Sequence, residues 1–143
     1  MKKQEATIYR EIQRNTEMAI TAIETISDKI QDPSLTRQIA EQELRYSELH
    51  NEAVKQLLQE KAEPYHGNFL AEAMLKTGIH CNTMLNTSTG HIAELMIKGS
   101  NMGILEMEKV LHHNRDAAEH AVSLGRELVA CEEENVKTLK DYL

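Results

Sequence analysis

Four side chains in this sequence have the chemistry of metal ligands and lie in stretches that favour helices. They are Glu43, His50, His91 and Glu132, and Asn135 and Asn15 are further polar residues of the same set. Carboxylate and imidazole groups suit iron, manganese and zinc, so the cofactor expected for such a set is a divalent Fe, Mn or Zn ion. Counting from the helix ends puts Glu43 and Glu132 at similar heights in a bundle. The alternative is that these side chains lie at the edge of an apolar face, solvated or paired with one another.

A second polar set crowds the junction of the last two predicted helices. It comprises Glu108, His112, His113, Asp116 and His120. Glu108 and His112 are four residues apart, as are Asp116 and His120, and metal sites on helices use this spacing. Helix ends are exposed, however, and histidines near a helix carboxyl terminus also interact favourably with its dipole. We therefore expect the second set to be a solvated surface.

No complete catalytic or cofactor-binding motif accompanies these residues. The sequence has no Ser, His and acid arrangement and no phosphate-binding glycine pattern at a meaningful spacing. His80 and Cys81 are neighbours, which on a helix would point them about 100° apart, so they are not a nucleophile and its base. Cys81 and Cys131 fit no zinc spacing and are expected to be reduced. We expect no catalytic and no cofactor-binding residues.

The spacing of apolar residues predicts an all-α fold in a single domain, residues 1–143. Apolar residues recur every three to four positions over long stretches that are interrupted by only two prolines. The predicted helices cover residues 5–31, 34–62, 68–86, 89–113 and 115–142. Asp32 is expected to cap the second of these helices, and Asn114 the last. A single continuous helix over 68–113 is the alternative to the third and fourth.

Helix lengths favour a bundle with one long crossover. At 1.5 Å per residue the four long helices measure about 37–43 Å, and a shorter helix over 68–86 spans about 28 Å. A connector of that length can return the chain most of the way along the bundle. The next long helix would then run parallel to the second.

The section from 67 to 107 differs from the rest of the chain, because it holds five charged residues and five of the seven methionines. Methionine adapts to irregular partners, so this section is expected to be core or, alternatively, a surface for self-association. Gly99 and Gly103 share one face of the predicted helix over 89–113. Glycine inside a helix costs about 1 kcal/mol relative to alanine, so a packing reason is expected. The simplest reason is close approach of a neighbouring helix backbone.

The charge of the chain argues against two classes of partner. The formal net charge is -7, and it is spread along the sequence without a basic cluster. Nucleic acids and anionic membranes are therefore not expected partners. The N-terminus lacks the apolar run of a secretory signal, which predicts a cytoplasmic protein.

Two long helices, a crossover and two more long helices, together with segments such as HIAELMIKGSNMGILEMEKV, resemble the ferritin-like superfamily, most closely its small bacterial members. The resemblance implies a four-helix bundle with an additional crossover helix between the second and third long helices. Family members that carry a di-iron centre use Glu-x-x-His pairs. Here Glu132 is followed at plus three by Asn135 and Glu43 by Tyr46, while Glu63-x-x-His66 falls in a turn. A complete di-iron motif is therefore absent.

These observations lead to two hypotheses for function. The first is a non-enzymatic ferritin-like bundle with a structural or protein-interaction role, which forms a homodimer or a higher homo-oligomer. The alternative is a divergent metal-binding or redox protein that uses the partial core site of Glu43, His50, Glu132 and His91. A weaker third hypothesis makes the bundle a recognition module for a helix of another protein.

Overall fold

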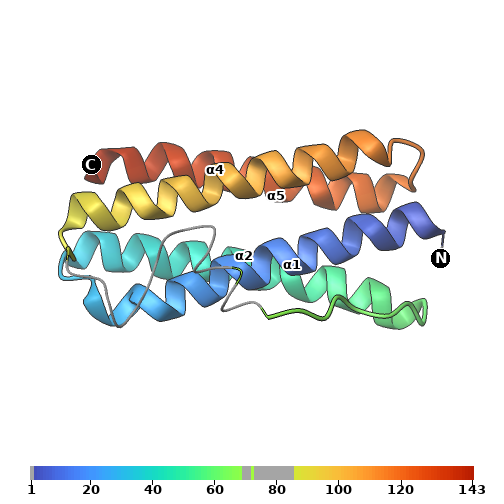
Figure 1. Cartoon of the computed structure of the whole chain (residues 1–143), viewed down its shortest axis with the longest axis horizontal. Helices are drawn as coiled ribbons and strands as arrows, with labels where there is room; N and C mark the ends of the chain where they lie inside the picture. The colour runs from blue at the N-terminus through green and yellow to red at the C-terminus, as the bar shows by residue number, and fades with distance from the viewer. Residues whose placement is uncertain (1, 69–71, 73–85) are drawn as a thin grey trace.

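Four long α-helices dominate the computed structural model of the chain, which describes residues 2–68, 72 and 86–143. The helices are α1 (Lys3–Ile26), α2 (Pro33–Gln59), α4 (Thr89–His113) and α5 (Glu119–Leu139). Single 3-10 turns, Ser27–Lys29 and Lys140–Tyr142, follow α1 and α5. The described residues contain no strand, so the all-α, four-helix prediction is confirmed (Figure 1). The predicted crossover helix over 68–86 lies outside the described residues, apart from residues 68, 72 and 86.

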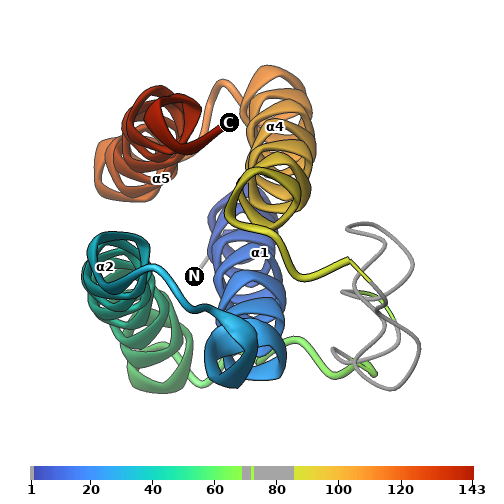
Figure 2. The same ribbon diagram turned by 90° about the vertical axis from the view of Figure 1, so that its left-hand side faces the viewer.

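The helices form two antiparallel hairpins, α1 with α2 and α4 with α5, packed against each other (Figure 2). At one end of the bundle Ser34, in the first turn of α2, lies 2.6 Å from the Tyr142 hydroxyl, and Gly90, in the first turn of α4, abuts Leu143. Both helices therefore begin beside the end of α5. It follows that α4 runs parallel to α2, the direction expected from the length of the connector (Figure 1).

The helix ends follow local chemistry that the sequence predicted only in part. The Asp32 carboxylate accepts bonds from the backbone N–H groups of Ser34 and Leu35, as expected of the cap of α2. Asn114 instead closes α4, because its side chain donates to the Val110 carbonyl at 2.7 Å. The predicted start of the last helix at 115 is therefore wrong, and α5 begins at Glu119.

The second helix also ends earlier than the predicted residue 62. The N–H of Ala62 bonds to the carbonyl of Leu57 and that of Lys61 to Leu58, which is the Schellman arrangement. Lys61 takes the left-handed backbone conformation that this arrangement requires, with φ of 56°. The first helix likewise ends at Ile26, and the 3-10 turn over 27–29 occupies most of the remaining predicted length to residue 31.

The core is a single apolar cluster drawn from all four helices. It includes Ile8, Ile12, Ile23 and Ile26 of α1, Leu35, Ile39 and Leu57 of α2, Ile92 and Met107 of α4, and Leu124, Leu128 and Leu139 of α5. Leu58 of α2 is 60% exposed, because its neighbour Leu57 occupies the core position. None of the described helices combines the length and apolar character needed to cross a membrane.

The segment after α2 runs back along α1. The Gln13 side chain bonds to both backbone groups of Tyr65: its amide nitrogen donates to the carbonyl at 3.1 Å, and its oxygen accepts from the N–H at 2.7 Å. Nearby, Arg10 donates to the carbonyl of Glu63. These hydrogen bonds pair backbone groups that lie outside any helix. They also fix the direction in which the chain leaves α2.

Candidate functional site

A carboxylate lies at the centre of the bundle. Glu132 of α5 is 1% exposed, and its Oε1 has no hydrogen-bond partner among the residues that the structure describes. An ionised carboxylate in such surroundings is strongly unfavourable unless a proton or a counter-charge neutralises it. Glu132 is therefore the residue from which a functional site in this chain can be built.

Gly103 of α4 makes room for this carboxylate. A Cβ atom at position 103 would lie 2.7 Å from Glu132 Oε1 and still closer to Oε2. Close approach of a neighbouring helix backbone was the expected reason for this glycine. The structure corrects that expectation at Gly103, because the atoms that crowd it belong to a side chain.

Neutral hydrogen-bonding side chains surround the carboxylate. Tyr46 of α2 is 2% exposed, and its hydroxyl accepts a hydrogen bond from the amide of Asn135 at 3.2 Å. Ser100 of α4 is also buried and lies within hydrogen-bonding reach of the same hydroxyl. The polar centre thus draws side chains from α2, α4 and α5.

The first helix contributes Asn15, which is 3% exposed and donates its amide N–H to the Gly103 carbonyl at 2.9 Å. Asn15, Tyr46, Ser100 and Glu132 all line a cavity of about 30 Å³. The other lining residues are apolar and come from α1 and α4: Met18, Ala19, Ala22, Met96, Gly99, Met102 and Gly103. This volume accommodates one or two water-sized species.

The surroundings of Glu132 favour its neutral form. Burial raises the pKa of Glu132 well above the ordinary value, and the negative charges of Glu106 and Glu11 raise it further. Burial also raises the pKa of Tyr46 well above its ordinary value, with the Glu132 charge as the second cause. Both groups therefore hold their protons more firmly than they would in water.

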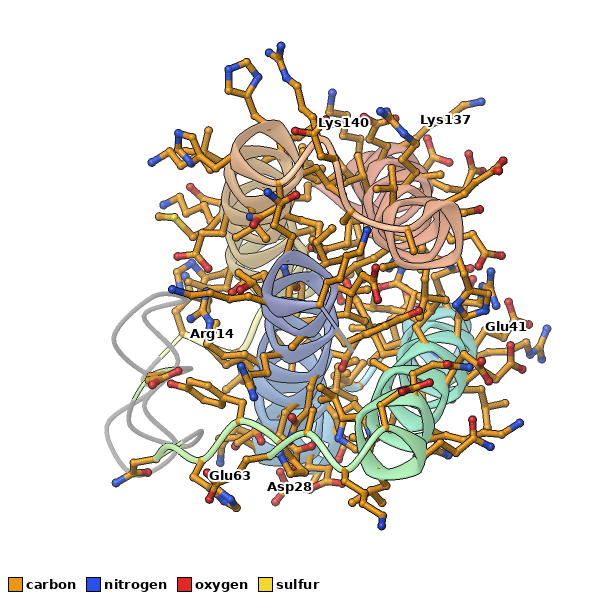
Figure 3. The ribbon with its side chains drawn as sticks, turned by 90° about the vertical axis from the view of Figure 1, so that its right-hand side faces the viewer. Arg14, Asp28, Glu41, Glu63, Lys137 and Lys140 are labelled. Carbon is orange, nitrogen blue, oxygen red and sulfur yellow. The ribbon has the colours of Figure 1, made fainter. Side chains whose placement is uncertain are left out.

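An ion-pair cluster borders the centre between α1 and α4. Arg14 pairs with Glu11 at 2.8 Å, with Glu72 at 3.6 Å and with Glu106, which lies on α4. Figure 3 shows Arg14 on the flank of α1, while Glu41 points outward from α2 on the far side of the bundle. Three carboxylates thus share the Arg14 guanidinium among the residues that the structure describes.

The four predicted metal ligands do not come together. His50 pairs with Glu17 on the flank of α1, with Nε2 and Oε2 2.6 Å apart, and His91 lies 3.8 Å from Glu94. Glu43 is partly buried, and its pKa is raised by burial and then by the charge of Glu24. In the part of the chain that the structure describes, no three His, Cys, Asp or Glu side chains are grouped as metal ligands.

The second predicted set separates in the same way. His112 contacts Arg115 and is exposed, in keeping with a solvated surface. His120, although 56% exposed at its side chain, has specific partners: its Nδ1 lies 2.6 Å from the Tyr9 hydroxyl and its Nε2 lies 3.7 Å from Glu52. These contacts link α5 to α1 and α2 at the end of the bundle.

Sequence reasoning missed part of the polar centre. Ser100 was not identified, and Glu43 was chosen in place of its neighbour Gln42. Gln42 is 2% exposed, and both of its side-chain polar atoms are unpaired among the described residues. Asn15 and Asn135, which interrupt apolar stripes on two helices, did indicate this centre. Polar residues at core positions of facing helices indicate a buried polar layer.

Cys131 lies next to this centre on α5 and is expected to be a poorly reactive thiol. Burial, reinforced by the Glu132 charge, raises its pKa to about 11. At pH 8 about one thiol in 1,000 would then be ionised, so we expect alkylation about 100-fold slower than for an exposed cysteine. Iodoacetamide kinetics on a Cys81→Ser variant measure this rate. Alkylation as fast in the native state as in urea would contradict the expectation.

No protein-family model matches the chain, and no curated protein sequence matches it. A solved structure with a similar fold is the crystal structure of a DUF305 fragment from Deinococcus radiodurans. The two share 14% sequence identity with a TM-score of 0.77, over 98% of this chain and 95% of that one. At this level of identity the likeness shows that the two chains have the same helical fold.

Proposed function

We propose that this chain is a ferritin-like bundle without a dinuclear metal centre, and that it acts by associating with further copies of itself rather than by catalysis. The helix order and directions support the first part, since two hairpins joined by a long connection place α4 parallel to α2. A dinuclear centre needs several carboxylates and histidines that project inward. Here Glu132 is instead accompanied by Asn15, Tyr46 and Asn135.

The observation that carries self-association is the outer surface of α4. Met96 and Met107 of this helix are buried in the core, whereas Met102 is 39% and Leu105 is 51% exposed. Met102 and Leu105 are three residues apart, so they are neighbours on the helix surface. Adjacent exposed apolar side chains are typical of an interface, whereas the exposed Leu44 and Leu58 of α2 lie far apart along their helix.

The test is the mass of the protein in solution. Size-exclusion chromatography with light scattering should give at least twice the monomer mass of 16.3 kDa at micromolar concentrations. Leu105→Glu should shift the mass towards the monomer, because the interface would have to bury an unpaired charge. Leu44→Glu is the matched control and should leave the mass unchanged. A wild-type monomer at the highest attainable concentration would reject the proposal.

A further inference from the structure

An unpaired carboxylate oxygen and a cavity meet at the centre of the bundle. Glu132 lines the cavity of about 30 Å³, and its Oε1 has no partner among the described residues. The volume is that of one or two water molecules, too small for an organic ligand. The group that completes this site is therefore a small species from solution.

The other polar side chains of the cavity offer oxygen atoms. Asn15 uses its amide nitrogen to donate to the Gly103 carbonyl, which leaves its Oδ1 uncommitted by that bond. The Tyr46 hydroxyl oxygen accepts a hydrogen bond from Asn135 and lies within hydrogen-bonding reach of Ser100. Ser100 adds another hydroxyl. Carboxylate, amide and hydroxyl oxygens are the donors that hard cations prefer.

The charges around the cavity also favour a cation. A bound cation would favour the ionised form of Glu132, and among the described residues Glu11, Glu72 and Glu106 all pair with Arg14 nearby. The apolar walls formed by residues such as Met18 and Met96 lower the local dielectric constant, which strengthens attraction to an ion inside. A single carboxylate suits one ion, since a pair of metal ions would require bridging carboxylates.

We propose that the bundle centre binds one hard cation, held by the Glu132 carboxylate together with the side-chain oxygens of Asn15, Tyr46 and Ser100. The candidate ions are Na⁺, K⁺, Mg²⁺ and Ca²⁺. Such a site differs from a dinuclear iron centre because it holds one ion and has no histidine ligand. Bound in this way, the ion would neutralise the buried carboxylate and link all four helices. This inference does not depend on the proposed self-association.

Thermal unfolding in defined salts tests the site. The protein is freed of metals with a chelator, transferred to choline chloride at pH 8 and unfolded in Na⁺, K⁺, Mg²⁺ or Ca²⁺ at matched ionic strength. At 100 times its Kd, the preferred cation should raise the midpoint by about 5–10 °C over choline, equivalent to about 2.7 kcal/mol. Tyr46→Phe should lower the apparent affinity about threefold to tenfold, since one oxygen donor is lost.

Two charge-neutralising variants make the result decisive. Glu132→Gln keeps the shape of the buried side chain and should abolish the cation response. Glu133→Gln removes the charge of an exposed neighbour on the same helix and should retain the response. Equal midpoints in choline and in all four cations would overturn the proposal, and so would a Glu132→Gln variant that responds like the wild type.

Discussion

Replacement of Gly103 by alanine is expected to lower the free energy of unfolding by about 1–3 kcal/mol, although alanine is the better helix former by about 1 kcal/mol. The new Cβ would lie 2.7 Å from Glu132 Oε1 and nearer still to Oε2, so the buried carboxylate would have to move. That movement would take the side chain out of its packed position and into the cavity that it lines, which costs free energy. Urea unfolding followed by circular dichroism measures the loss.

Two further variants show whether the carboxylate is the cause. Gly90→Ala is the matched control, since the atom nearest to its new Cβ would be 3.4 Å away at the chain end, and it should change stability by less than about 0.5 kcal/mol. In a Glu132→Ala background, Gly103→Ala should become neutral or stabilising, because the side chain that it would strike is gone. An undiminished penalty in that background would show that Gly103 is required for another reason.

The apolar periodicity was sufficient to predict the four helices and most of their core. The buried residues follow the three-to-four spacing, as in Ile8, Ile12, Ile23 and Ile26 of α1 and Leu124 and Leu128 of α5. This part of the fold is local, because the 3.6-residue repeat decides which side chains share a face. The end of each helix depends on single hydrogen bonds, such as that from Asn114 to Val110, and was predicted less well.

The candidate site was predicted only in part, for a geometric reason. Glu132 was identified and is buried, whereas Glu43 was preferred to Gln42, its neighbour about 100° around the helix. A rotation of that size decides whether a side chain faces the core, and the rotation of α2 is fixed by its packing against α1 and α5. His50 and His91 have the side chains of metal ligands but lie on the flanks of their helices, where each is close to a carboxylate.

The sequence alone could not show why position 103 is a glycine, because the explanation also depends on how the helices pack. Its partner Glu132 is 29 residues further along the chain, on the other side of a turn whose length was itself mispredicted. Asn135 and Tyr46, from separate helices, become hydrogen-bonded partners only once α2 and α5 are placed side by side. Pairings of this kind follow from the tertiary arrangement, which hydrophobic spacing leaves undetermined.

Replacement of Glu132 by glutamine should remove a large pH dependence from the stability of the bundle. The fold raises the pKa of Glu132 well above the ordinary value of 4.5, chiefly by burial, so the folded state holds the proton over a pH range in which the unfolded chain has lost it. The folded state then binds more protons, and stability must fall as the pH rises. The contribution is fully present below about pH 4.5 and is lost as the pH rises towards the folded pKa.

Within that range the wild type should lose about 1.4 kcal/mol per pH unit relative to Glu132→Gln. Urea unfolding at pH 5, 6 and 7 in choline chloride measures the divergence without a competing cation. Glu133→Gln, which neutralises an exposed neighbour, should parallel the wild type. Parallel curves for the wild type and Glu132→Gln would mean that the carboxylate ionises as easily in the fold as in water, which its 1% exposure and unpaired Oε1 argue against.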